Sequence, residues 1–188
     1  MPNAFIETAL PGVFLIEPGV FSDNRGFFME TYHKDRYGKG GIDAIFVQDN
    51  YSHSQKGTLR GLHYQLEHGQ AKLIYVITGE IFDVAVDIRE GSPTFGQWIG
   101  EYLSAENKRQ IFIPEGFAHG FCVISEEADV IYKCTDFYAP GDEYGIFWAD
   151  PEIKIAWPMN DVVISEKDER NPRLSDVSED ALPGYNGS

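Results

Sequence analysis

The chain has 188 residues and a formal net charge of -15. A chain of this length can form one domain with a sizeable core, and an aromatic content of 14% is inconsistent with disorder. The acidity excludes a nucleic-acid partner, because binding to phosphates requires a basic surface. A protein with this net negative charge can bind an anionic ligand only where a few arginine and lysine side chains converge.

Cysteine usage and hydropathy bear on the compartment. Cys122 and Cys134 lack the spacing of a zinc site, and no stretch resembles a secretory signal or a membrane span. Two thiols in apolar strands are usually buried and inert, so a disulfide is the less favoured alternative. We therefore expect a cytoplasmic protein without a membrane partner.

Short segments rich in β-branched and aromatic residues recur along the chain, separated by glycine, proline and acidic residues. They lie at 13–17, 27–32, 44–50, 57–65, 72–79, 81–88, 98–103, 110–113, 118–124 and 130–135. Before the C-terminal third, only residues 32–41 leave room for a helical turn or two. The pattern predicts an all-β antiparallel sandwich or barrel with a few short helices, mainly in the C-terminal third.

The two segments at 57–79 carry charged and titratable side chains within strand-forming sequence, namely Arg60, His63 and Lys72. Such side chains are unfavourable in a β-core unless they have partners or a ligand. We expect these segments to form a hairpin and to hold the chemistry of the protein. Strict alternation puts Arg60 and His63 on opposite faces, unless a bulge, a twisted strand end or a dimer interface intervenes.

The segment 81–88 alternates between apolar residues and the positions of Asp83, Ala85 and Asp87, which predicts a half-buried strand. We interpret the two carboxylates as structural rather than as a catalytic pair, although Asp83 has a place near a pocket. Further along, Trp148 and Trp157 are expected to fasten the looser C-terminal part onto the barrel. We expect a single domain over residues 1–170 and an extended acidic tail over 171–188.

Two motifs resemble those of the cupin superfamily. Gly57, His63 and Gly79 match the first motif, and residues 114–119, which end in His119, match the second. Metal-binding cupins hold their ion with three histidines and a glutamate from these motifs.

Two of those ligand positions differ in this chain, because Gln65 replaces a histidine and Lys72 replaces the glutamate. An ammonium group repels a divalent cation, and two histidines alone make a poor site. We therefore expect no metal, with the lysine charge in place of the ion.

Five motifs together narrow the resemblance to the dTDP-4-dehydrorhamnose 3,5-epimerase family. They lie in order at 60–65, 79–87, 104–107, 113–121 and 164–168, within a resemblance that runs from about Phe5 to Asp168. The resemblance implies a cupin-type antiparallel jelly-roll barrel that acts as a homodimer without a cofactor. It also implies a small-molecule substrate, dTDP-4-dehydro-6-deoxy-D-glucose, converted to dTDP-4-dehydro-L-rhamnose in dTDP-rhamnose biosynthesis.

The implied chemistry suits the residues. Carbons 3 and 5 both lie beside the ketone at carbon 4, so inversion needs a base on one face and an acid on the other. The resemblance makes His63 the base and Asp168 its partner. Tyr132 matches the proton donor, with Tyr138 as its rival. Lys72 would stabilise the enolate by a few kcal/mol, ~3.

The resemblance also implies a set of substrate-binding residues, some of which supply the cations that a diphosphate requires in so acidic a protein. They are Arg25, Glu30, Gln48, Asn50, Arg60, His119, Glu143 and Lys167, with Tyr138 stacking on thymine. The remaining histidines, His33, His53 and His68, are interpreted as structural.

Three alternatives remain. The first is an epimerase of a related nucleotide 4-keto sugar that inverts only carbon 3 or carbon 5, with the same base and acid. The second is a metal-dependent cupin oxygenase, against which Gln65 and Lys72 weigh. The third is a sugar-binding cupin without activity, since one fold serves many functions.

Overall fold

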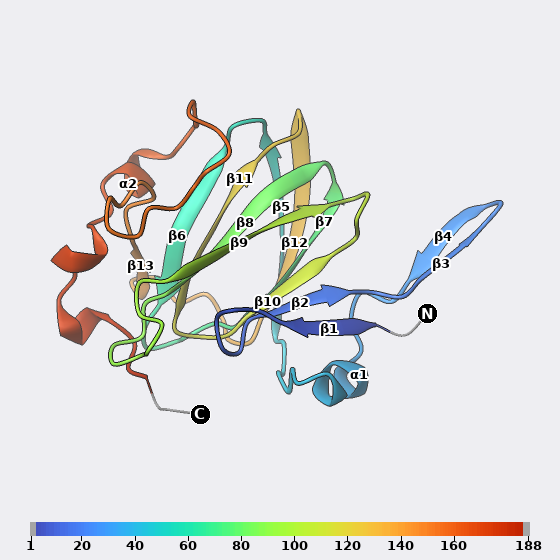
Figure 1. The fold of residues 1–188 in the computed structure, drawn as a ribbon, viewed down its shortest axis with the longest axis horizontal. Helices are drawn as coiled ribbons and strands as arrows, with labels where there is room; N and C mark the ends of the chain where they lie inside the picture. Colours follow the sequence, from blue (N-terminus) through green and yellow to red (C-terminus); the bar gives the residue numbers. More distant parts are fainter. Residues whose placement is uncertain (1–2, 186–188) are drawn as a thin grey trace.

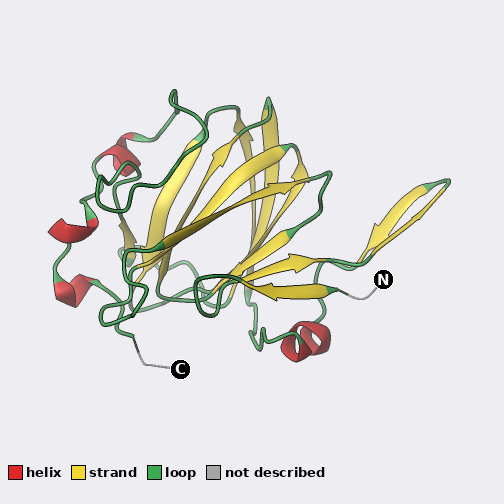
Figure 2. Cartoon of the chain, in the orientation of Figure 1, coloured by secondary structure: helices red, strands yellow, loops and turns green. Residues whose placement is uncertain are grey.

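The computed structural model describes residues 3–185, which form two antiparallel sheets packed face to face (Figures 1 and 2). The six-stranded sheet contains, in spatial order, β1 (Ala4–Glu7), β2 (Phe14–Glu17), β10 (Gln110–Ile113), β7 (Lys72–Thr78), β12 (Glu127–Cys134) and β5 (Gln48–Gln55). The five-stranded sheet contains β13 (Glu143–Gly145), β6 (Leu59–Gln65), β11 (Phe117–Val123), β8 (Glu80–Asp87) and β9 (Trp98–Ser104). The predicted antiparallel jelly roll is confirmed.

The remaining elements are short. A hairpin of β3 (Val20–Asp23) and β4 (Gly26–Met29) projects from the body as an arm (Figure 1). The helices are α1 (Lys34–Lys39), α2 (Glu166–Glu169) and two 3-10 turns, Leu174–Asp176 and Glu179–Ala181. They match the expectation of few and short helices. None of the helices in the described part of the chain is both long enough and apolar enough to span a membrane.

The predicted hairpin at 57–79 is wrong, because β6 and β7 belong to opposite sheets. β6 pairs with β11 and β13, whereas β7 pairs with β10 and β12. Strand-forming composition and a polar loop indicate two strands, but they do not say whether the strands pair with each other or with strands distant in sequence. In this jelly roll the 66–71 connection therefore crosses from one sheet to the other.

β5 begins and ends later than the segment predicted at 44–50. It pairs with β12 along its whole length, from Gln48 opposite Cys134 to Gln55 opposite Glu127. The strand is at the edge of its sheet and is mostly polar, so its composition does not mark it as a strand. The apolar residues just before it, including Phe46, instead pack as coil beside α1.

Three apolar clusters hold the layers together. One lies between the sheets, and another, which includes Ile16, Tyr37 and Phe112, packs α1 against the six-stranded sheet. The third covers the outer face of the five-stranded sheet, where Phe82 and its neighbours contact residues from the C-terminal segment. β8 is consequently buried on both faces, so the prediction of a half-buried strand is wrong. The C-terminal segment that covers the second face of β8 has no strand pattern in the sequence, so this burial was not predicted.

The C-terminal segment contributes to this outer layer. The Trp157 ring contacts Phe82 edge-on, with centroids 6.1 Å apart, which confirms its predicted fastening role. Residues 171–185 form two 3-10 turns rather than the expected extended tail, and Leu174 is buried. Residues 186–188 of that tail lie outside the described residues, and a domain boundary at residue 170 remains a prediction.

A β-bulge in β6 resolves the conflict over Arg60 and His63. His63 is opposite His119 on β11, but Arg60 is opposite Phe121, so β6 has one extra residue in this interval. The bulge puts Arg60 and His63 on the same face of the sheet. A bulge was one of the three explanations considered from the sequence. Gly61 sits within the bulge with φ of 121° and a backbone close to β11.

Gly61→Ala is expected to destabilise the protein strongly, by about 3 kcal/mol or more, through backbone strain and steric overlap. A Cβ at this position would lie 2.6 Å from Gly120 Cα and 2.7 Å from His119 O. Gly26→Ala is the matched control, since Gly26 has a similar φ of 133° but nothing within 4 Å. Denaturant unfolding of both variants measures the difference, and equal losses would contradict the argument.

Candidate active site

A cavity of about 530 Å³ opens between the two sheets. Residues from both sheets line it, together with residues from α2 and the segment before it. They are Ser52, Thr58, Leu59, Arg60, His63, Lys72, His119, Phe121, Tyr132, Glu143, Val163, Ile164, Ser165, Lys167 and Asp168. A smaller hollow of about 130 Å³ adjoins it and shares His63, Lys72 and Tyr132 with it, adding Gln48, Asn50 and Tyr138.

His63 and Asp168 form a close pair in this cavity. His63 Nε2 lies 2.7 Å from Asp168 Oδ1. The Asp168 backbone N–H donates to Ser165 Oγ, the cap of α2, and Gly61 N–H donates to the second carboxylate oxygen at 3.3 Å. The bulge and the short helix together therefore fix this carboxylate behind the imidazole.

The ionisation of Asp168 determines which nitrogen of the His63 ring carries a hydrogen toward the carboxylate. Burial raises the pKa of this carboxyl, but the hydrogen bond and charge of His63, helped by Gly61 and Ser165, outweigh it and leave the pKa below its usual value. An ionised carboxylate only accepts hydrogen bonds, so His63 Nε2 carries the hydrogen. Nδ1 of the neutral ring then keeps its lone pair and can accept a proton.

His119 is held by a second carboxylate. Its Nε2 lies 2.9 Å from Asp83 Oδ2, and both side chains are almost fully buried. Asp83 projects from β8 toward the interior beside Phe121, so it supports a cavity residue. The prediction that Asp83 is structural and close to a pocket is consistent with this arrangement.

Lys72 and Tyr132 enter the cavity from the opposite sheet. They lie on β7 and β12, whereas His63 lies on β6. Burial lowers the pKa of the Lys72 ammonium, although neighbouring acidic groups, among them Asp83, partly offset this. Burial likewise raises the pKa of the Tyr132 phenol, which therefore remains protonated over a wide pH range. The cavity thus has an imidazole on one wall and an ammonium and a phenol on the other.

Charged groups also border the mouth of the cavity. Lys167 forms an ion pair with Glu143, whose carboxylate also accepts a hydrogen bond from the Tyr138 phenol at 3.4 Å. The hydrogen bond with Glu143 raises the pKa of Lys167. Arg60 donates from Nε to Ser54 Oγ at 3.1 Å. Arg60 and Lys167 therefore provide cations at the cavity, as the predicted binding of an anion requires.

The polar residues of β5 line the same region. Gln48 Nε2 donates to Asn50 Oδ1 at 3.1 Å, and the Asn50 amide donates to Cys134 Sγ at 3.5 Å. The sequence analysis missed Ser52 and Ser54, which continue this inward-facing row. Every residue from 48 to 54 has a hydrogen-bonding side chain, so the alternation in burial is not accompanied by an alternation in polarity that could have indicated them.

The structure does not bring Arg25 and Glu30 to the cavity of their own chain. Arg25 lies at the tip of the arm, where it forms an ion pair with Asp23. Glu30 follows the arm and pairs with Arg36. Every other residue predicted to act on or bind the substrate lines the cavity or the adjoining hollow.

The cavity does not combine the ligands of a metal-binding cupin. Gln65 uses its amide to bind backbone groups, donating to the carbonyls of His68 and Phe137. Each of the two cavity histidines already has a carboxylate partner. Within residues 3–185 no three histidine, cysteine, aspartate or glutamate side chains cluster as metal ligands. What the cavity offers instead is a histidine–aspartate pair on one wall and a phenol and a lysine amine on the other.

Comparisons with known proteins show which proteins this chain resembles. The family model described as dTDP-4-dehydrorhamnose 3,5-epimerase matches residues 7–176. A protein of that name from Pseudomonas aeruginosa is 56% identical over 171 residues, which cover 90% of this chain and 94% of the relative. One from Neisseria gonorrhoeae is 53% identical over 178 residues and 94% of this chain, but the match spans only 54% of that longer relative.

A solved structure extends the similarity to three dimensions. The dTDP-6-deoxy-D-glucose-3,5-epimerase of Legionella pneumophila, crystallised in complex with dTDP-4-keto-L-rhamnose, superimposes with a TM-score of 0.96. It is 51% identical in sequence, and the match covers 98% of this chain and 100% of that one.

Proposed function

This chain belongs to the dTDP-4-dehydrorhamnose 3,5-epimerase family, and we propose that the cavity between its sheets is where the isomerisation takes place. The enzyme converts dTDP-4-dehydro-6-deoxy-D-glucose to dTDP-4-dehydro-L-rhamnose by inverting carbons 3 and 5. One observation carries the assignment of the cavity. His63, backed by Asp168, lies on one wall, and Lys72 and Tyr132 lie on the other.

His63 is the base. Its neutral ring removes the proton from carbon 3 or carbon 5, and the adjacent Asp168 carboxylate stabilises the imidazolium that forms. The electrons move onto the oxygen at carbon 4 and give an enolate. Because both carbons adjoin that one carbonyl, a single base and a single oxyanion site serve both inversions.

Lys72 and Tyr132 complete each inversion. The Lys72 ammonium stabilises the enolate oxygen, and Tyr132 returns a proton to the face opposite His63. We assign the acid role to Tyr132 rather than to Tyr138. Tyr132 is half-buried and on the wall that faces His63, whereas Tyr138 is 52% exposed and its phenol contacts Glu143.

The mouth of the cavity binds the nucleotide part. Arg60 and Lys167 pair with the diphosphate, and Tyr138 stacks on the thymine ring. The other polar residues around them, Gln48, Asn50, His119 and Glu143, hydrogen-bond to the substrate. The convergence of two cations in a chain with a net charge of -15 supports this arrangement.

The enzyme works as a homodimer in which the arm reaches the partner's cavity. Arg25 and Glu30 would then join the site from the second copy. The exposure of Phe21, Phe27 and Phe28, which are 58%, 58% and 70% accessible, supports this role for the arm. The enzyme acts in the cytoplasm, in keeping with its two free, buried cysteines.

His63→Asn is expected to lower kcat about 10²- to 10⁴-fold, as loss of a general base does. His53→Asn is the matched control, since His53 also pairs with an aspartate, Asp129, at 2.9 Å, but on an exposed surface. Incubation with the keto sugar in deuterated water, followed by NMR, measures label at carbons 3 and 5. Undiminished exchange in the His63 variant would overturn its role, and label at one carbon only would indicate a single-site epimerase.

Lys72→Arg is expected to lower kcat and to move the alkaline limb of the kcat profile to higher pH. As the pH rises, Lys72, with its lowered pKa, loses its proton before Tyr132, whose pKa is raised, whereas an arginine stays charged. Lys133→Arg, on the other face of the six-stranded sheet, should leave the profile unchanged. An alkaline limb at the same pH in the Lys72 variant would assign it to another group.

Coexpression of Arg25→Ala and His63→Asn subunits tests the arm. If Arg25 serves the partner's cavity, each mixed dimer has one intact site, because the His63→Asn subunit supplies Arg25 to the cavity that retains His63. We expect turnover well below the substrate KM to exceed that of either variant alone. Activity no higher than the sum of the two homodimers would show that Arg25 does not act across an interface.

A further inference from the structure

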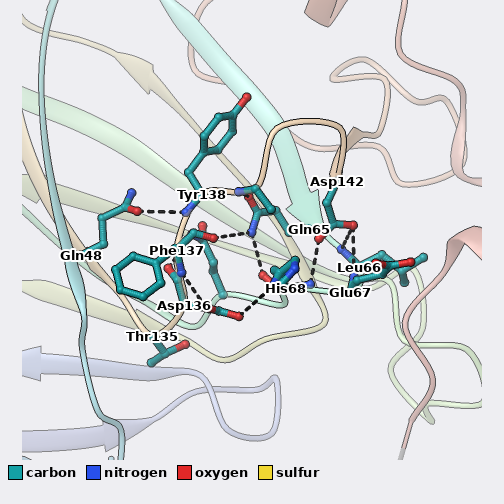
Figure 3. Close-up of polar contacts among 12 residues, drawn as sticks. Gln48, Gln65, Leu66, Glu67, His68, Thr135, Asp136, Phe137, Tyr138 and Asp142 are labelled. Atoms are coloured by element: carbon teal, nitrogen blue, oxygen red, sulfur yellow. Dashed lines mark hydrogen bonds and ion pairs between the residues drawn. The ribbon is translucent and has the colours of Figure 1, made fainter.

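Two glutamine side chains hold the backbone around Tyr138 (Figure 3). The Phe137 carbonyl accepts a hydrogen bond from Gln65 Nε2 at 3.2 Å, and the Ala139 N–H donates to Gln65 Oε1 at 3.0 Å. Between them, the Tyr138 N–H donates to Gln48 Oε1 at 2.9 Å. Three consecutive residues of the β12–β13 connection are thus anchored by side-chain amides.

Asp142 ties the far end of the same connection to the 66–71 loop. Its carboxylate accepts hydrogen bonds from three successive backbone N–H groups, those of Leu66, Glu67 and His68, at 3.2, 3.1 and 2.8 Å. Burial raises the pKa of Asp142, but these bonds outweigh it and leave the pKa below its usual value. Gln65 joins the same loop by donating to the His68 carbonyl at 2.7 Å.

The Tyr138 side chain itself is anchored weakly. Its ring is 52% exposed and points away from the cluster of backbone contacts (Figure 3). The phenol makes a long hydrogen bond of 3.4 Å to Glu143. The direction of the ring therefore depends on the backbone that carries it, and that backbone is held mainly by Gln65 and Gln48.

We propose that Gln65 is a positioning residue that presets Tyr138 for the nucleobase of the substrate. The inference rests on the proposed function, in which Tyr138 stacks on thymine. Gln65 is buried, with 8% exposure, and its amide forms hydrogen bonds with the backbone on both sides of Tyr138. A preset ring loses less conformational freedom when the ligand binds, so Gln65 increases affinity for the nucleotide and leaves the chemical step unchanged.

The test is a double-mutant cycle with dTDP as the probe. Gln65→Leu is expected to weaken dTDP binding about tenfold, or about 1.4 kcal/mol, in isothermal titration calorimetry. In a Tyr138→Ala background the same substitution should have no further effect, because there is no ring to position. Equal losses in both backgrounds would overturn the proposal. Turnover at saturating substrate should be preserved in Gln65→Leu, and a fall in kcat without a change in dTDP affinity would also overturn it.

A matched pair of aspartates separates positioning from general destabilisation. Asp150, like Asp142, is buried and accepts three backbone N–H bonds, but it holds the outer C-terminal segment through Glu152, Ile153 and Leu174. Asp142→Asn and Asp150→Asn should both lower the melting temperature, and only Asp142→Asn should weaken dTDP binding. Equal affinities in the two variants would contradict the proposal. Since dTDP binding is measured without turnover, this result is independent of the role of His63.

Discussion

Several charged side chains in and around the cavity are paired with fixed partners, and this pairing is the constraint on which the rest of the structure depends. A buried titratable group without a partner is strongly unfavourable. Asp168 pairs with His63, Asp83 with His119 and Glu143 with Lys167. Each pair joins two different elements, so the contacts that satisfy the charges also define the shape of the cavity.

This constraint explains why local irregularities occur where they do. A regular β6 would turn Arg60 away from His63, and the bulge at Gly61 brings both to the cavity. The same bulge aims the Gly61 N–H at Asp168. A one-residue departure from the ladder therefore sets both the position of Arg60 and the contacts of the His63–Asp168 pair. The bulge requires a glycine at position 61, because the adjacent strand leaves no room for a Cβ.

The sequence predicted the strands well where they are apolar, because alternation and β-branched residues report directly on burial. It failed at β5, whose inward-facing residues are polar because they line the cavity, and at β8, whose second buried face is created by a distant C-terminal segment. Most of the residues that line the cavity were proposed through the family resemblance rather than through local pattern. Arg25 and Glu30 lie away from the cavity of their own chain, on and just after the arm.

The sequence predicted a hairpin at 57–79, whereas the structure places its two strands, β6 and β7, in opposite sheets. Had β6 and β7 paired with each other, His63 and Lys72 would lie in one sheet and approach a ligand from the same side. Inversion at carbon requires the proton to leave from one face and return to the other, while the oxyanion between them is stabilised. The crossover between sheets puts His63 on one wall of the cavity and Lys72 and Tyr132 on the other. The jelly-roll connection, which local sequence cannot reveal, is therefore what makes the residues of one short segment fit for this chemistry.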